Sequence, residues 1–187
     1  MKKFFLLLMI LTVSCCRSTN PHFYQPVAIT TADLAYRDFK KTVLVKNVIM
    51  PAEQRRPQIT TIGKDDVTLR IDEFNRWGAM PDKLIQNVIR QDLNSYLPNA
   101  DIEIQTPLQK NYQYAVMVEI NTFNGKLGEK AVLEANYAIL NKSGVSLKSG
   151  DLNESVAIKG GYDEYVKAQS RLLGALTEEI AADLSKL

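Results

Sequence analysis

Several side chains used in catalysis and metal binding are scarce in these 187 residues. The chain has one histidine and two cysteines. The single histidine, His22, excludes the commonest zinc sites and any catalytic relay centred on histidine inside the fold. Cys15 and Cys16 are adjacent and lie near the start of the chain, so the part that follows them can form neither a disulfide nor a thiolate metal site.

An excess of one charge is also missing. Lys2 and Lys3 lie in a segment that we expect to be removed, and without them the 23 basic residues fall to 21 and equal the 21 acidic residues. Proteins that bind nucleic acids normally carry a basic excess, because phosphate neutralisation supplies most of their affinity. The balance argues against a nucleic-acid partner. Hydrophobic residues at 45% and charged residues at 24% are ordinary for a folded soluble domain, and they argue against a disordered chain and a polytopic membrane protein.

The first sixteen residues have the pattern of a secretory signal. Lys2 and Lys3 precede an uncharged, mostly apolar run over residues 4–13, and the small residue Ser14 follows before Cys15. At about 1.5 Å per residue, this run would span about 15 Å, half of a bilayer core, so it is too short for a transmembrane helix. The alternative is a buried N-terminal helix or strand of the mature domain.

Residues 11–15, Leu-Thr-Val-Ser-Cys, resemble a bacterial lipobox. In that motif the cysteine thiol is lipidated, cleavage occurs just before the cysteine, and the new amino group is acylated. We predict that Cys15 is the lipidated residue, with Cys16 as the second choice. By resemblance to lipoprotein sorting in Gram-negative bacteria, an aspartate after Cys15 would signal retention in the inner membrane. Cys16 stands there instead, so we expect the outer membrane, facing the periplasm. The predicted segments are a signal peptide over 1–14, a lipidated tether over 15–24 and a single α+β domain over 25–187.

Beyond the tether, the hydrophobic pattern changes between strand and helix periods. Residues 67, 69 and 71 are apolar and alternate with polar residues, which is typical of a half-buried strand. Residues 80–97 and 162–187 carry apolar residues three and four apart, which predicts two long helices. Strand patterns occupy residues 22–29, 42–50, 58–62, 67–74, 102–104, 112–123, 131–140 and 145–158, and 31–39 is ambiguous. We predict an α+β fold, with the two helices packed on a mixed or antiparallel sheet of about six to seven strands.

The sequence contains no arrangement that indicates catalysis. It has no Gly-x-Ser-x-Gly motif and no glycine loop that would hold a phosphate. The carboxylates Asp65/Asp66 and Asp72/Glu73 are adjacent in sequence, so a strand would point each pair to opposite faces. We interpret them as solvated turn and edge residues rather than an acid/base pair. The sequence therefore predicts a protein that is not an enzyme, and it predicts no metal and no cofactor beyond the covalent lipid.

Two stretches place arginine beside residues that favour protein contacts. One is a charged loop directly before a strand, and the other holds the single tryptophan between a strand and a helix. Arginine and tryptophan are enriched at interface hot spots. The candidate partner-binding residues are Arg55, Arg56, Pro57, Gln58, Arg76 and Trp77. The structural alternative is that Trp77 packs at the junction of strand and helix, with Arg76 stacked on it or paired with a carboxylate.

Several short segments, taken in order, resemble the ABC-type transport auxiliary lipoproteins, in particular the PqiC/YmbA-like group. They are residues 56–59, 76–77, 97–98, 123–125, 133–135, 162, 169–170 and 172–180. Residues 78–81 depart from the commoner acidic-proline-leucine pattern after the tryptophan. Together with the lipobox, the resemblance covers nearly the whole mature chain.

This resemblance implies a lipoprotein without catalytic activity. Such proteins accompany MCE-domain proteins, which form tunnels carrying lipids between the inner and outer membranes. The expected role is to dock the tunnel at the outer membrane and support envelope integrity. Its partners would be the MCE-domain protein and its inner-membrane transporter, and a ring-shaped partner would suit a homo-oligomer. A second hypothesis is a periplasmic lipid carrier, which would need an apolar cavity of several hundred Å³ between sheet and helices.

Overall fold

The structure is a computed structural model that describes residues 20–29, 36–108 and 111–187. The predicted signal peptide, Cys15 and Cys16 lie outside the described residues, as does most of the ambiguous segment 31–39. Within the described ranges, eight strands and two long helices confirm the α+β class. Their order is β1 (His22–Tyr24), β2 (Thr42–Val45), β3 (Gln58–Ile62), β4 (Leu69–Trp77), α2 (Pro81–Tyr96), β5 (Asp101–Ile104), β6 (Tyr114–Lys126), β7 (Lys130–Asn141), β8 (Ser146–Ala157) and α3 (Tyr162–Leu184).

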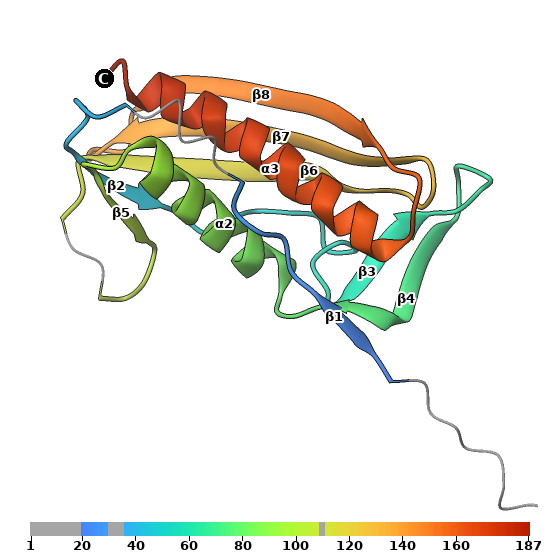
Figure 1. Cartoon of the computed structure of the whole chain (residues 1–187). Helices are drawn as coiled ribbons and strands as arrows, with labels where there is room; N and C mark the ends of the chain where they lie inside the picture. Colours follow the sequence, from blue (N-terminus) through green and yellow to red (C-terminus); the bar gives the residue numbers. More distant parts are fainter. Residues whose placement is uncertain (1–19, 30–35, 109–110) are drawn as a thin grey trace, which may run out of the picture.

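The larger sheet has five strands in the order β5-β2-β6-β7-β8. Strands β6, β7 and β8 form an antiparallel meander, whereas β2 pairs in parallel with both β5 and β6. Figure 1 shows α2 and α3 side by side on one face of this sheet. Helix α3 contacts β7 and β8, and α2 contacts β2 and β5. The sheet is therefore mixed, and the helices form a second layer over it.

The core lies between the helices and the five-stranded sheet. The predicted apolar stripes of both helices are buried there, since Ile85, Ile89 and Leu93 of α2 are fully buried, as are Leu176 and Ile180 of α3. Full burial of such a side chain contributes about 1.5–3 kcal/mol relative to exposure. Helix α2 begins at Pro81. Proline suits the first helical position because a backbone N–H there would have no partner within the helix, so the helix loses nothing when it is absent.

The remaining strands form a second sheet, so the expectation of one sheet with six to seven strands is corrected to eight strands in two sheets. The order in this three-stranded sheet, the small sheet, is β1-β4-β3, with β1 parallel and β3 antiparallel to β4. A bulge interrupts β4, because Gln58 pairs with Arg76 while Thr60 pairs with Ile71. The Oδ1 atom of Asp72 stabilises this bulge by accepting hydrogen bonds from the backbone N–H groups of residues 74 and 75, both at 2.8 Å.

The pattern of β4 predicts a half-buried strand, and the structure differs. Leu69 is 38% exposed, Ile71 is 41% exposed, and Val67 in the preceding turn is almost fully exposed. The physical reason is position: the main neighbours of β4 are β1 and β3 within the small sheet, and the helices pack on the other sheet. Alternation along a strand identifies an apolar face, but it does not show that another layer covers that face.

Candidate functional site

Trp77 lies where the small sheet, β6 and α3 meet. Its side chain is only 3% exposed. Its ring centroid is 5.5 Å from that of Phe123 in β6 and 6.4 Å from that of Tyr165 in α3. The backbone N–H of Trp77 donates to the carbonyl oxygen of Pro57 at 2.6 Å. This geometry fits the packing alternative for Trp77, which reaches the surface only through the residues around it.

Two buried amide side chains join the elements around this tryptophan. The Oε1 atom of Gln54 accepts a hydrogen bond of 2.5 Å from the backbone N–H of Phe123, which fixes the loop before β3 to β6. The Nε2 atom of Gln169 in α3 donates to the carbonyl oxygens of Asn124 at 2.8 Å and Val132 at 3.2 Å. Buried polar groups are costly unless they are paired, so these bonds specify how the elements meet.

Gly125 allows a close approach of β6 to β7 beside this junction. A Cβ atom on Gly125 would lie 2.7 Å from the Cα atom of Ala131 and would overlap the carbonyl oxygen of Lys130. Only glycine fits there, because both obstacles are backbone atoms. The segments 56–59, 76–77, 123–125 and 169–170, which carry the family resemblance, thus converge on one structural junction.

Arg55 is held at the start of α2. Its Nε atom donates to the Oδ2 atom of Asp82 at 3.1 Å; the Arg55 side chain is exposed, whereas that of Asp82 is buried. The carboxylate also lies in the first turn of the helix, where the helix dipole favours a negative charge. The ion pair therefore fixes one edge of the guanidinium and leaves other N–H donors directed away from this contact. Arg56 is half-buried, and its buried Nε atom has no hydrogen-bond partner.

Gln58 and Arg76 lie side by side on the small sheet. They are paired across β3 and β4, and Arg76 is also paired with Phe23 across β4 and β1, so the three side chains share one face. Glu73 holds the first two: its Oε2 atom accepts from Nη2 of Arg76 at 3.0 Å and from Nε2 of Gln58 at 3.3 Å. An exposed pair of this kind contributes at most about 1 kcal/mol to stability, so its main effect is to orient the two side chains.

The six candidate residues thus fall into three settings. Arg55 contacts the start of α2 and is followed by half-buried Arg56, Gln58 and Arg76 lie together on the small sheet, and Trp77 is buried with its backbone bonded to Pro57. Sequence reasoning missed Gln54, because a lone amide in a charged loop gives no signal of burial. Tyr165 and Gln169 did show a signal in the sequence, because residues four apart lie on the same face of a helix.

Asp72 links the bulge of β4 to α3. Its Oδ2 atom accepts a hydrogen bond of 2.9 Å from the hydroxyl of Tyr162. Burial alone would raise the pKa of Asp72, but the hydrogen bonds from the N–H groups of Asn75 and Phe74 and from Tyr162 outweigh it and lower that pKa. Burial and the adjacent Asp72 carboxylate raise the pKa of the Tyr162 hydroxyl. The carboxylate is therefore stabilised in its charged form.

Replacing Asp72 with asparagine is expected to lower the free energy of unfolding at pH 7 by about 1 kcal/mol. The pKa of Asp72 is lower in the folded protein than in the unfolded chain, where aspartate titrates at about 3.9. The charged carboxylate therefore stabilises the folded state above about pH 4, and this stabilisation is lost as the pH falls through the folded-state pKa. The difference between wild type and Asp72→Asn should therefore shrink in acid, as measured by urea denaturation from pH 7 down to pH 3. Tyr162→Phe removes only one donor and should give an intermediate curve. A constant difference across this range would contradict the assignment.

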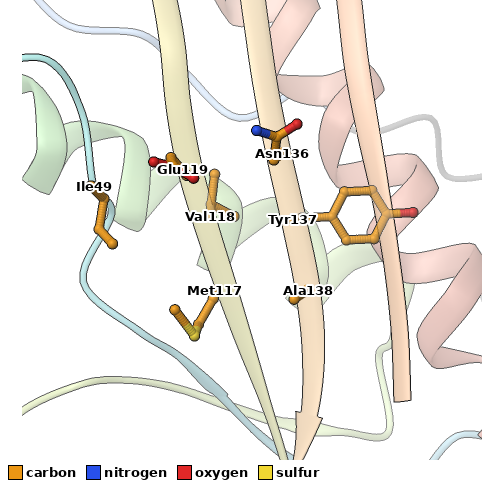
Figure 2. Close-up of a pocket in the computed structure, with 7 residues that line it drawn as sticks. All are labelled: Ile49, Met117, Val118, Glu119, Asn136, Tyr137 and Ala138. Atoms are coloured by element: carbon orange, nitrogen blue, oxygen red, sulfur yellow. The ribbon is translucent and has the colours of Figure 1, made fainter. Parts of the chain in front are cut away.

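A mostly apolar hollow lies on the sheet face that the helices leave open. It has a volume of about 150 Å³ and is lined by Ile49, Met117, Val118, Glu119, Asn136, Tyr137 and Ala138. Figure 2 shows these residues on β6, β7 and the segment after β2. Tyr137 points the other way, because its hydroxyl donates to Asp183 of α3 at 3.0 Å. The hollow is therefore a shallow surface feature rather than a cavity between the layers.

Neither a metal centre nor a membrane span is found in the part of the chain that the structure describes. No group of three histidine, cysteine, aspartate or glutamate side chains in residues 20–29, 36–108 and 111–187 could hold a metal ion. Over the same residues, neither helix combines the length and the apolar character needed to cross a bilayer.

Solved structures share this fold at low sequence identity. The crystal structure of an uncharacterized protein is 19% identical, covers 88% of this chain and 99% of its own, and has a TM-score of 0.68. A DUF330 protein from Xanthomonas campestris is 13% identical over 85% of this chain and 92% of its own, with a TM-score of 0.71. A variant of the PelC dodecamer from Paraburkholderia phytofirmans is 14% identical over 87% and 95%, with a TM-score of 0.50. No curated protein matches the chain.

The family assignment rests on a model that spans most of the chain. The family described as the ABC-type transport auxiliary lipoprotein component matches residues 25–181. This range holds the junction around Trp77, both helices for nearly their full length and all strands from β2 to β8. It confirms the resemblance seen in the short segments of the sequence. The chain belongs to the ABC-type transport auxiliary lipoprotein component family.

Proposed function

We propose that this protein is a non-catalytic outer-membrane lipoprotein that docks an MCE-domain protein. In this role, it would serve a system that moves phospholipids between the inner and outer membranes, together with an inner-membrane transporter, and would support envelope integrity. Membership of a family of transport auxiliary lipoproteins over residues 25–181 is the observation that carries the proposal. An auxiliary component works through its contacts, so the candidate site is a docking surface.

The proposed contacts are the exposed residues around Trp77. Arg55 is held by the buried carboxylate of Asp82, and Arg76 is held by Glu73, so both guanidinium groups are oriented before a partner arrives. Less side-chain entropy is lost when such groups bind, which favours affinity. Trp77 would act from beneath, because it fixes β4 and, through Pro57, the loop that carries Arg55 and Arg56.

Replacing both Arg55 and Arg56 with glutamine is expected to reduce capture of the MCE-domain partner about tenfold, since hot-spot arginines often contribute 1–2 kcal/mol or more. The measurement is in-cell crosslinking, affinity purification and mass spectrometry. The matched control is Lys142→Gln with Lys148→Gln, which removes two positive charges from exposed sites at the β7–β8 turn. Melting temperatures of both variants separate loss of contact from loss of fold.

The two parts of this proposal can fail separately. If wild type captures no MCE-domain protein, the proposed partner is wrong. If wild type captures it and the arginine variant captures it equally well, the partner stands and the site is wrong.

We also propose that the protein assembles with copies of itself. PelC, which shares the fold, is a dodecamer. Light scattering after size-exclusion chromatography of the purified protein would test this, and a monomer at all concentrations would contradict it.

The carrier hypothesis receives less support from the fold. The layer between helices and sheet is filled by buried side chains such as Leu93, Val116, Leu133 and Leu176. The mostly apolar hollow on the open sheet face, at about 150 Å³, is smaller than the roughly 300–1,000 Å³ of typical ligand sites, and the larger hollow beside Tyr36 and Phe39, at about 330 Å³, also contains the polar residues Arg37, Asp38 and Ser185. A carrier reading would regain support if the purified domain retained phospholipid in stoichiometric amounts.

A further inference from the structure

Two phenylalanines are exposed on the small sheet, one on its edge strand β1 and one on the neighbouring central strand β4. Phe23 in the edge strand β1 is 65% exposed, and Phe74 in β4 is 47% exposed. Phe23 is paired with Arg76, two residues beyond Phe74, so the two aromatic residues lie on neighbouring strands, with Phe74 inside the bulge of β4.

The exposed apolar surface continues along β4. Ile71 and Leu69 are partly exposed and alternate on the strand that carries Phe74. Single exposed apolar residues are common on soluble proteins, but a group of them on one uncovered face marks a contact surface. The charges beside the two phenylalanines are balanced, with Arg76 paired to Glu73. This favours an apolar contact that does not depend on the charge of its partner.

The length of chain before β1 limits what this edge can meet. β1 begins at His22, seven residues after Cys15. A fully extended chain spans at most about 3.3–3.6 Å per residue, so His22 lies within about 25 Å of Cys15. The opposite end of the domain, with the β7–β8 turn, is separated from this edge by the length of α3, about 35 Å for its 23 residues. Figure 1 shows β1 at one end of the molecule and the turn between β7 and β8 at the other, near the C-terminus.

We infer that the edge of the small sheet, through Phe23 and Phe74, rests in the interfacial layer of the membrane that holds the lipid anchor. This inference rests on the proposed function, because it takes Cys15 as lipidated. Aromatic and other large apolar side chains favour the interface between water and lipid, so exposed phenylalanines near an acyl anchor suit a contact with that layer. β1 then faces the lipid together with Arg76, which is paired with Phe23, so the contacts left for the partner are β3 and the Arg55–Gln58 loop on the far edge of the small sheet.

Tryptophan scanning tests this orientation with little background. The chain has one tryptophan, and Trp77 is buried, so its emission stays constant while a second tryptophan reports the contact. The variants are Phe23→Trp and Phe74→Trp. The matched controls are Val145→Trp and Leu108→Trp, at exposed apolar sites in the β7–β8 turn and the loop before β6. Each full-length lipidated protein is placed in phosphatidylcholine vesicles with and without brominated acyl chains.

Brominated lipid is expected to quench the added emission by about half at positions 23 and 74, because an aromatic ring at the interface lies next to the acyl chains. Little quenching is expected at positions 108 and 145. Equal quenching at all four positions, or stronger quenching at position 145, would overturn the orientation. If no variant binds vesicles, the lipid anchor fails and the proposed function fails with it. If all variants bind and only the quenching pattern is wrong, the proposed function stands.

Discussion

Replacing Trp77 with alanine is expected to lower the free energy of unfolding by about 3–5 kcal/mol. The side chain is 3% exposed and contacts the rings of Phe123 and Tyr165, which belong to β6 and α3. Its loss would leave a cavity where three elements meet, and the surrounding backbone cannot close it freely. The free energy of unfolding is measured by urea denaturation. Unfolding is followed by circular dichroism, because Trp77→Ala removes the only tryptophan and with it the fluorescence signal.

Phe74→Ala is the matched control for this prediction. It removes an aromatic ring from the same strand, but one that is 47% exposed, so its cost should stay near 0.5 kcal/mol. Trp77→Phe keeps part of the ring packing and should cost less than Trp77→Ala. Equal costs for Trp77→Ala and Phe74→Ala would contradict the structural role of Trp77 and restore it as a surface contact.

Replacing Cys15 with alanine is expected to release the protein from membranes. Each buried methylene contributes about 0.8 kcal/mol, so losing two or more acyl chains removes nearly all of the anchoring free energy. Two exposed phenylalanines could not hold the domain on a bilayer without the anchor. Membrane fractionation, with mass spectrometry of the N-terminal peptide, measures the outcome.

Cys16→Ala distinguishes the two adjacent cysteines. If Cys15 is lipidated, Cys16→Ala stays with the membrane and its N-terminal peptide keeps the lipid mass. Release of Cys16→Ala but not of Cys15→Ala would move the modification to Cys16. Retention of both variants, without a lipid mass on either, would remove the anchor from the proposed function.

Local patterns predicted the elements of this fold closely. The expected helices over 80–97 and 162–187 are observed as Pro81–Tyr96 and Tyr162–Leu184. They could be predicted because helix periodicity and helix stop signals depend only on residues that are close in the sequence. The division into two sheets could not be predicted in the same way. It depends on β1 pairing with a strand about fifty residues away and on a bulge that the Asp72 carboxylate stabilises, and neither is a local pattern.

The candidate site was predicted in part. An arginine beside a tryptophan is consistent with an interface and with a packed junction, and the sequence leaves both open. Burial of Trp77 is determined by Phe123 and Tyr165, which lie far along the chain. The ion pair of Arg55 with Asp82 likewise joins a loop to a helix start that is distant in sequence. Residue types therefore singled out these side chains as candidates, and only the fold separates the exposed from the buried.

The three-residue strand β1 has a mechanical consequence. In the proposed orientation, the membrane holds the protein through β1, and a docked partner holds it near β3. Tension between them would cross the small sheet through the β1–β4 and β3–β4 ladders and through backbone bonds such as Gly78 to Tyr24 at 2.7 Å and Trp77 to Pro57 at 2.6 Å. The β1–β4 ladder pairs only three residues and is the shortest on this path. Under strain, it would therefore open before the long ladders of β6, β7 and β8.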